Sequence, residues 1–300
     1  MSLERIHIPG LLRTLVPRPA PRAVRKKVFG RDPETYDRVR PRYPERIFEV
    51  LTRRCGLGPR SVVFEVGPGT GIATRELLRR GVEALTLIEP DRRLARYLRA
   101  TLDPHETRVT IRNTPFERVS LAPAAYDLGI AATSFHWLPE RQALRKVARV
   151  LRPGGWWAAW NSQTSEPSRP DRFHRAIQPL YRQLSPHGRS PDPARERTRA
   201  RMRRRARLRA LRSAGRFDRV SLEEARWPWT IDTEQVVALW GTFSEIATLS
   251  PGARATFLAG LRRVADGQFG GRVRLSMTSW LYTARRAPNR NGPTRRGRSP

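Results

Sequence analysis

Between residues 61 and 161, short apolar runs alternate with segments whose apolar residues recur every three or four positions. Runs of about five apolar residues are typical of strands buried on both faces, and the three-to-four-residue period is typical of helices packed on a sheet. The pattern predicts strands at 61–66, 84–88, 108–112, 126–133 and 156–160, and helices at 44–54, 70–80, 91–102 and 140–150. This alternation indicates an α/β fold with a mostly parallel sheet and helices on both faces.

The alternation changes on either side of this region. Pro41 and Pro44 disfavour a helix in residues 36–44, which we expect to be extended. The segments 152–155, 162–171 and 186–193 are predicted to be a turn and two loops. After residue 161 the pattern predicts helices at 173–184, 194–212, 233–249 and 251–265, and strands at 217–230 and 272–285.

The length of 300 residues permits one large α/β domain, or one domain with an appendage. Changes in composition suggest the boundaries. We predict a flexible basic arm (1–30), an α/β core (31–161), an Arg-rich helical insertion (162–216), a closing strand–helix–strand part of the same domain (217–286) and a disordered tail (287–300).

The chain is strongly basic, with a net charge of +32 from 59 basic and 27 acidic residues. Nearly all basic residues are Arg; the lysines are Lys26, Lys27 and Lys146. One interpretation is a basic face for nucleic acid, anionic lipid or an anionic substrate. The other is a genome whose base composition favours Arg codons, although that does not explain the shortage of acids. We favour codon composition, because the basic residues are widely spread and only the cluster at 195–212 is dense.

A single cysteine, Cys55, excludes a disulfide within the chain and argues against a cysteine-based metal site. No apolar run reaches the roughly 20 residues that span a bilayer, and the N-terminal residues are a poor secretory signal. These features predict a cytoplasmic protein that has no membrane segment and needs no metal.

The segment from Glu65 to Gly71 is the strongest candidate for a ligand-binding loop. A buried strand ends at Val66, glycines follow at 67, 69 and 71, and a helix begins at once. Glycines allow a sharp turn and close approach of a ligand, and the helix N-terminus presents free amides to it. In open α/β sheets, ligands bind beyond the carboxyl ends of such strands. The G-x-G-x-G spacing differs from the G-x-G-x-x-G of dinucleotide loops, and no Gly-Lys-Ser/Thr of a P-loop follows.

Glu89 ends the next predicted strand, 18 residues after Gly71. A carboxylate at this position can accept two hydrogen bonds from a ribose diol. The alternative is a solvated strand end, with Asp91 serving only as a helix cap. We favour the ribose role because the glycine loop precedes Glu89 in the matching register.

Several segments together resemble one known family. They are residues 36–44, 65–71, 88–91, 131–137 and 148–155. Residues 36–161 resemble the domain of class I S-adenosylmethionine (SAM)-dependent methyltransferases, of the methyltransferase type 11 kind and near the trans-aconitate methyltransferase-like group; residues 217–285 resemble the family's closing region. The resemblance implies a Rossmann-like seven-stranded sheet whose last strand is antiparallel, here with a helical insertion before strand six.

The resemblance also implies roles for individual residues. Gly67, Gly69 and Gly71 would wrap the methionine part of SAM, with Glu65 belonging to the same motif. Glu89 would hold the ribose. The cofactor implied is SAM, and no metal is implied.

Residues after the third strand and before the first would complete the cofactor site. Thr114 and Phe116 lie where the family lines the adenine, although Asn113 stands where many members carry an Asp. Tyr36, Arg40 and Tyr43 would close over the site. Arg40 is equally well interpreted as a partner of the cofactor carboxylate or as an ordinary surface arginine.

The acceptor is less well defined by the sequence. His136 follows the fourth strand and is a candidate general base, but we favour passive lining of the cavity by His136 and Trp137. No Asn/Asp-Pro-Pro-Tyr/Phe follows that strand, which argues against a nucleobase amine as the target. We therefore expect O- or N-methylation of a small molecule. The resemblance to a carboxylate methyltransferase group, together with the positive charge of the chain, favours an anionic one.

The basic segment 195–212 supports an alternative, an RNA-binding methyltransferase. It lacks interleaved aromatic residues for base stacking, and a solvated insertion is the simpler interpretation. A degenerate cofactor-binding partner subunit is disfavoured by the intact glycine loop. We expect a monomer or homodimer that acts on a small-molecule acceptor.

Overall fold

The structure is a computed structural model that describes residues 32–103, 108–164, 170–184, 193–214 and 216–288. The predicted arm at 1–30 and nearly all of the predicted tail at 287–300 lie outside the described residues. None of the helices within these ranges combines the length and the apolar character that a membrane crossing requires.

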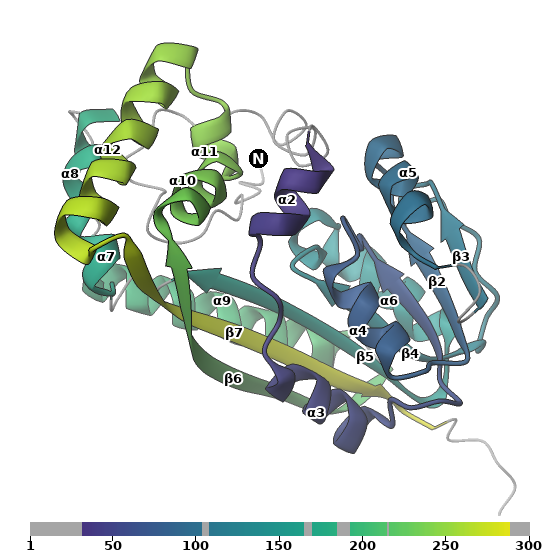
Figure 1. The fold of residues 1–300 in the computed structure, drawn as a ribbon. Coiled ribbons are helices and arrows are strands. Elements are labelled where there is room, and N and C mark those ends of the chain that lie inside the picture. Colours follow the sequence, from purple (N-terminus) through teal and green to yellow (C-terminus); the bar gives the residue numbers. More distant parts are fainter. Residues whose placement is uncertain (1–31, 104–107, 165–169, 185–192, 215, 289–300) are drawn as a thin grey trace, which may run out of the picture.

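The described strands form one seven-stranded sheet in the order β3-β2-β1-β4-β5-β7-β6 (Figure 1). Its strands are β1 (Val62–Val66), β2 (Ala84–Ile88), β3 (Arg108–Arg112), β4 (Tyr126–Ala132), β5 (Leu151–Thr164), β6 (Phe217–Asp232) and β7 (Arg272–Arg286). β7 runs antiparallel to both of its neighbours, β5 and β6, whereas β1 to β5 pair in parallel. The predicted Rossmann-like α/β fold with an antiparallel last strand is confirmed.

Helices cover both faces of the sheet, so the central strands β1 and β4 are buried on both sides. The helices are α2 (Pro33–Val39), α3 (Glu45–Cys55), α4 (Ile72–Arg79), α5 (Arg92–Thr101), the 3₁₀ turn η1 (Phe135–Trp137), α6 (Glu140–Val150), α7 (Arg172–Ala176), α8 (Gln178–Leu184), α9 (Pro193–Ser213), α10 (Thr233–Gly241), α11 (Ser244–Ala247) and α12 (Pro251–Phe269). The helices α7, α8 and α9 form the helical insertion expected before β6.

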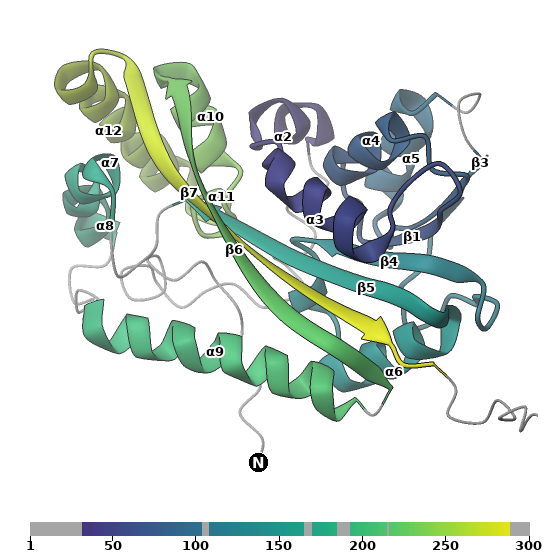
Figure 2. The ribbon, with the colours of Figure 1, turned by 90° about the horizontal axis from the view of Figure 1, so that it is seen from below.

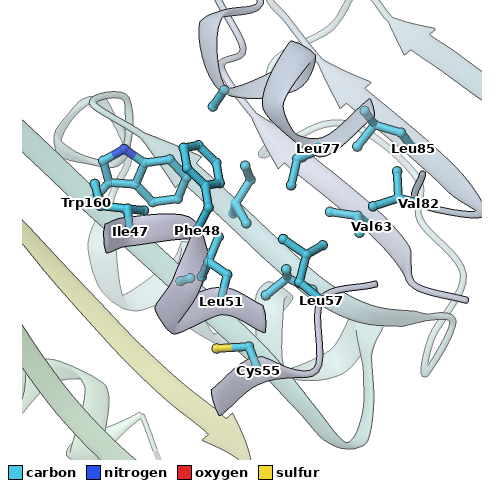
Figure 3. Close-up of a cluster of buried hydrophobic side chains, with 14 of the residues drawn as sticks. Ile47, Phe48, Leu51, Cys55, Leu57, Val63, Leu77, Val82, Leu85 and Trp160 are labelled. Carbon is cyan, nitrogen blue, oxygen red and sulfur yellow. The ribbon is translucent and has the colours of Figure 1, made fainter. Parts of the chain in front are cut away.

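One core lies between the sheet and the helices α3, α4 and α5. Figure 3 shows Phe48 and Leu51 of α3 packed toward Trp160 of β5 and Leu77 of α4. The opposite face is covered by α6 and α9, as Figure 2 shows from below. Burying large apolar side chains on both faces stabilises the sheet by about 25 cal/mol per Å² of apolar surface.

The last three strands of the sheet, β5, β7 and β6, extend beyond the parallel part. Around their far end, α7, α8, α10 and α12 form a third core that includes Phe173, Tyr181, Trp240 and Leu261. The indole of Trp240 donates to the hydroxyl of Tyr181 at 2.9 Å, so the polar atoms of these two buried rings are satisfied. This cap stands beside α2 at the carboxyl end of the sheet (Figure 1).

The prediction of an extended conformation for residues 36–44 is wrong for residues 36–39, because α2 occupies residues 33–39. The Asp32 side chain accepts from the amide of Thr35 at 2.9 Å and caps the helix. Pro33 lies in the first turn, where its missing N–H costs nothing. Pro41 and Pro44 follow the helix end, so they limit its length without preventing it.

Other differences concern the ends of elements. The predicted turn at 152–155 and the start of the predicted loop at 162–171 belong to β5, whose pairing with β4 shifts register between Tyr126 and Leu128. The predicted helix at 173–184 is divided into α7 and α8, and that at 233–249 into α10 and α11. Pairing across a sheet extends strands beyond the apolar run that predicts them.

Candidate active site

A cavity of about 1010 Å³ opens at the carboxyl ends of β1, β2 and β4. This is the edge at which ligands bind in open α/β sheets. Its wall is formed by residues 36, 40, 43, 66–70, 72–73, 88–94, 115–118, 132–134, 136–138, 161–162 and 243–245.

The first two glycines of the loop line this cavity in the left-handed conformation, with φ of 65° at Gly67 and 64° at Gly69. A Cβ on Gly69 would meet no atom within 4 Å, so its backbone borders open space. A Cβ on Gly67 would stand 2.8 Å from the Cβ of Ser134, whose hydroxyl donates to the carbonyl of Val66. The loop is therefore fixed to the end of β4, with its backbone open to a ligand.

The third glycine, Gly71, does not line the cavity. Its φ is 87°, and a Cβ there would lie 2.9 Å from Leu98 of α5. Gly71 therefore permits the turn into α4 and the close packing of α4 against α5.

Glu65 also lies outside the cavity wall and is fully buried beneath the loop. One carboxylate oxygen accepts from the hydroxyl of Thr74 at 2.7 Å, and the other has no hydrogen-bond partner among the described residues. Burial raises the pKa of Glu65 to about 7, against which the Thr74 hydrogen bond acts. The side chain ties β1 to α4.

Glu89 lines the cavity and is only 4 % exposed. Its Oε2 accepts from the amide of Gly69 at 3.0 Å and its Oε1 from the amide of Asp91 at 2.9 Å. Burial raises the pKa of Glu89 to about 7, although both amides favour the ionised form. The alternative of a solvated strand end is excluded, and Asp91 caps α5 as well, by accepting from the Arg93 amide at 2.8 Å.

The loop after β3 contributes Phe116, which is 2 % exposed and lines the cavity, whereas Thr114 does not. Asn113 donates its side-chain amide to the carbonyl of Glu89 at 2.8 Å. This residue, found where the family often carries an Asp, thereby braces the end of β2 instead of lining the cavity.

Lys146 of α6 holds this loop from behind and was not predicted from the sequence. Its ammonium donates to the carbonyls of Phe116 at 2.6 Å, Glu117 at 3.2 Å and Val119 at 2.5 Å. It also lies 5.1 Å from the centre of the Phe116 ring. The only available signal was the presence of a lysine in a chain whose cations are nearly all arginine.

Arg40 and Tyr36 form the roof of the cavity. The guanidinium of Arg40 lies over the rings of Tyr36, at 4.6 Å, and Phe243, at 5.0 Å, and donates to the carbonyl of Thr242 at 3.3 Å. Its Nε is buried and has no partner among the described residues. Arg40 is thus no ordinary surface arginine, because it joins α2 to the segment between α10 and α11.

Tyr43 closes the cavity between this roof and the sheet. Its hydroxyl lies 3.1 Å from the hydroxyl of Thr133, and its ring packs edge-on to Trp160 with centroids 5.3 Å apart. Thr133 has a left-handed φ of 55°, and its amide donates to the carbonyl of Trp160 at 2.8 Å. Burial raises the pKa of Tyr43, so the hydroxyl stays protonated. Backbone strain at a cavity wall is typical of functional sites.

His136 lies on η1 and lines the cavity, with its ring centre 4.8 Å from that of Trp137. Asn161, Ser244 and Glu245 are among the other polar residues that line the cavity and were not predicted as site residues. The Oδ1 of Asn161 is buried without a partner among the described residues, and Ser244 donates to Glu245 at 3.2 Å. These residues belong to β5 and α11, far along the chain from the glycine loop.

Cys55 is buried in α3 and is absent from the cavity wall. Burial raises the pKa of its thiol to about 12. It is therefore a packing residue and not a nucleophile.

Residues 63–155 match the family model of a methyltransferase domain. An uncharacterized methyltransferase of Mycobacterium tuberculosis is 32% identical over 136 residues, which are 45% of this chain and 52% of the relative. A methyltransferase-like protein of Schizosaccharomyces pombe is 26% identical over 138 residues, 46% of this chain and 52% of the relative. The match thus spans about half the length of these curated relatives.

Solved structures share the fold over most of the chain. A protein described as a candidate type II methyltransferase from Anaeromyxobacter dehalogenans has a TM-score of 0.58 at 22% identity, over 83% of this chain and 99% of that one. A candidate methyltransferase of an antibiotic biosynthesis pathway from Anabaena variabilis has a TM-score of 0.52 at 13% identity, over 80% of this chain and 98% of that one. Both solved structures therefore have the same fold as this chain.

Proposed function

We propose that this chain, which belongs to the class I SAM-dependent methyltransferases, transfers a methyl group to an oxygen or nitrogen atom of a small anionic acceptor. The observation that carries the proposal is the buried carboxylate of Glu89, held at the amide of Gly69 in the wall of a large cavity. The hydrogen bond holds the backbone of the glycine loop and the Glu89 carboxylate side by side, so both can contact the same ligand.

The residues present fit SAM. Gly67 and Gly69 leave backbone open to the cavity, as the methionine part requires, and no Cβ fills the space at Gly69. The Glu89 carboxylate supplies acceptors for a ribose diol. Phe116 borders the same cavity and makes its surroundings apolar, which suits an adenine ring.

Arg40 is proposed to bind the carboxylate of the cofactor. Its guanidinium is held in place by two rings and a carbonyl, while Nε still has a hydrogen to donate. A charge-assisted bond from a fixed guanidinium is stronger than one from a mobile side chain.

SAM, when bound, supplies an electrophilic methyl group, so the protein's task is to position the acceptor and exclude water. Tyr43 and Thr133 close the floor near the end of β4. The acceptor would be held on the side formed by His136, Asn161 and Ser244. We assign His136 to the wall and not to proton transfer, since methyl transfer needs no fixed base.

The support for an anionic acceptor is the resemblance of the sequence to the trans-aconitate methyltransferase-like group, whose acceptor is a carboxylate. Four arginines (Arg40, Arg92, Arg93 and Arg118) and four acids (Glu89, Asp91, Glu117 and Glu245) line the cavity, so the wall itself carries no excess of positive residues.

The proposal is tested by titrating the full chain with SAM and by screening acceptors with labelled SAM, using metabolite and RNA pools side by side. We expect SAM to bind, Gly69→Arg and Glu89→Ala to weaken binding, and label to enter acidic small molecules. Failure of the unaltered chain to bind SAM contradicts the proposal, and label in RNA alone contradicts the small acceptor.

A further inference from the structure

The helix α9 presents a basic face that the methyl-transfer site does not use. Ten of its 21 residues are Arg, and residues 201–212 contain no acid. Arg201, Arg205, Arg209 and Arg212 are all exposed. Their spacing of four, four and three residues places them on one side of the helix, over about 16 Å at 1.5 Å per residue.

The opposite side of α9 fixes this face to the body of the protein. Leu211 is fully buried and Leu208 partly buried in the core shared with α6. Arg207 forms an ion pair of 2.6 Å with Glu140 of α6 and lies 4.7 Å from the Phe135 ring centre. The solvated insertion expected from the sequence is therefore, in its second half, a packed helix with a fixed orientation.

A second row of cations lies on the neighbouring helix. Arg141, Arg145 and Arg149 of α6 are exposed and four residues apart. Both helices cover the same face of the sheet, so their outer sides point the same way (Figure 2). None of these seven arginines forms an ion pair with a described residue, and none lines the cavity.

We propose that the outer faces of α6 and α9 form a binding surface for the phosphate backbone of a nucleic-acid duplex. Two rigid rows of arginines match a partner whose anionic charges are dense and regularly spaced. Neither helix contains an aromatic residue on which bases could stack, so we expect the arginines to contact mainly phosphates. We therefore expect binding to depend little on nucleotide sequence.

The composition of this surface disfavours a lipid membrane as the partner. Helices that lie in a membrane surface carry Trp, Phe or Leu on the side opposite their charges. Here the apolar side of α9 is used in the core, and Met202, 63 % exposed, is the one large exposed hydrophobic residue among the described residues. Apart from Met202, this surface has no large apolar side chain to insert into lipid.

The test is fluorescence anisotropy of the full chain with labelled RNA and DNA duplexes of about 20 base pairs, between roughly 50 and 200 mM salt. The variant replaces Arg201, Arg205, Arg209 and Arg212 with Gln, which preserves helix propensity. We expect affinity to fall at least tenfold at about 100 mM salt, and the slope of log K against log salt to decrease by roughly 0.9 for each phosphate that the variant no longer neutralises. Replacing the three α6 arginines with Gln should also weaken binding.

A matched control replaces Arg53, Arg60, Arg96 and Arg99 with Gln, four exposed arginines on or near α3 and α5 over the opposite face. It removes the same charge and should change affinity by less than about threefold, because distant charges are screened. Equal losses of duplex affinity in the two variants, or no duplex binding by the unaltered chain, would overturn the proposal. Binding to phosphatidylserine vesicles instead of duplexes, or displacement of the duplex by polyglutamate at equal charge concentration, would also overturn it.

SAM titration and circular dichroism of each variant check the fold. Because the surface is separate from the cavity, the α9 variant should retain SAM binding, and Glu89→Ala should retain duplex binding. The failure of one proposal is therefore distinguishable from the failure of the other.

Discussion

The amide of Gly69 donates to the carboxylate of Glu89 at 3.0 Å, joining the first and second strand ends of the parallel sheet. The bond keeps the loop in position while the carboxylate remains at the cavity wall. Burial raises the pKa of that carboxyl to about 7, so its charge changes near neutral pH.

We predict that SAM affinity rises between about pH 6 and 8 in the unaltered protein. Ribose hydroxyls donate to the ionised carboxylate, so binding lowers the pKa of Glu89 and releases a proton. Across this range the affinity changes roughly tenfold for each unit by which binding lowers that pKa. Calorimetric titration across this range measures the effect. In Glu89→Gln the ligand's own titration remains, so an identical pH profile in both proteins would refute the assignment.

The buried Glu65 should make the protein less stable as pH rises. Its folded pKa of about 7 exceeds the ordinary value of 4.5, so the native state binds more protons and the free energy of unfolding falls between these values. Glu65→Gln should be more stable than the parent above about pH 7, by on the order of 2 kcal/mol, with a smaller difference near pH 5. Urea unfolding at both pH values measures this, and a difference independent of pH would contradict the burial argument.

Lys146→Met should make the loop of Phe116 in the cavity wall less firmly held, while the methionine still fills the space beside Phe116. The variant keeps the apolar stem and removes the donors to three backbone carbonyls. We expect a loss of about 1–3 kcal/mol in stability and a severalfold weaker SAM affinity. Arg145→Met, on an exposed position of the same helix, is the control, and equal effects of the two would show that the carbonyl contacts are unimportant.

Arg40→Gln should distinguish a cofactor contact from a structural one. If Arg40 binds the cofactor carboxylate, the variant should bind S-adenosylhomocysteine with roughly tenfold lower affinity. Methylthioadenosine, which lacks that carboxylate, should bind the variant and the parent alike. A parallel loss for both ligands would mean that Arg40 acts only by joining α2 to Thr242.

His136→Asn should lower kcat by less than about tenfold once an acceptor is identified. General-base catalysis contributes roughly 10²–10⁴ in rate, whereas a wall residue mainly affects acceptor binding and raises KM. Steady-state kinetics with the acceptor varied separates these outcomes. A loss of about a hundredfold in kcat with KM unchanged would make His136 a catalytic residue.

Much of the core followed from local pattern, because each buried strand and amphipathic helix carries its own period. The strand at 108–112 and the helix at 140–150 have the predicted bounds. Pro41 and Pro44 predict extended backbone before them, but Asp32 and Pro33 start helix α2, which ends at Val39, before either proline. The extent of β5 was missed because pairing with β7 extends it.

The sequence alone determined the glycine loop and the acidic strand end, since both are encoded in residues close together between two strands. Tertiary structure decided which of them face the cavity: Gly69 and Glu89 line it, while Gly71 and Glu65 pack behind it. It also brought Arg40 to Thr242, 202 positions away, and Lys146 to the loop of Phe116. Such contacts depend on how the sheet orders its strands, and no local period records that order.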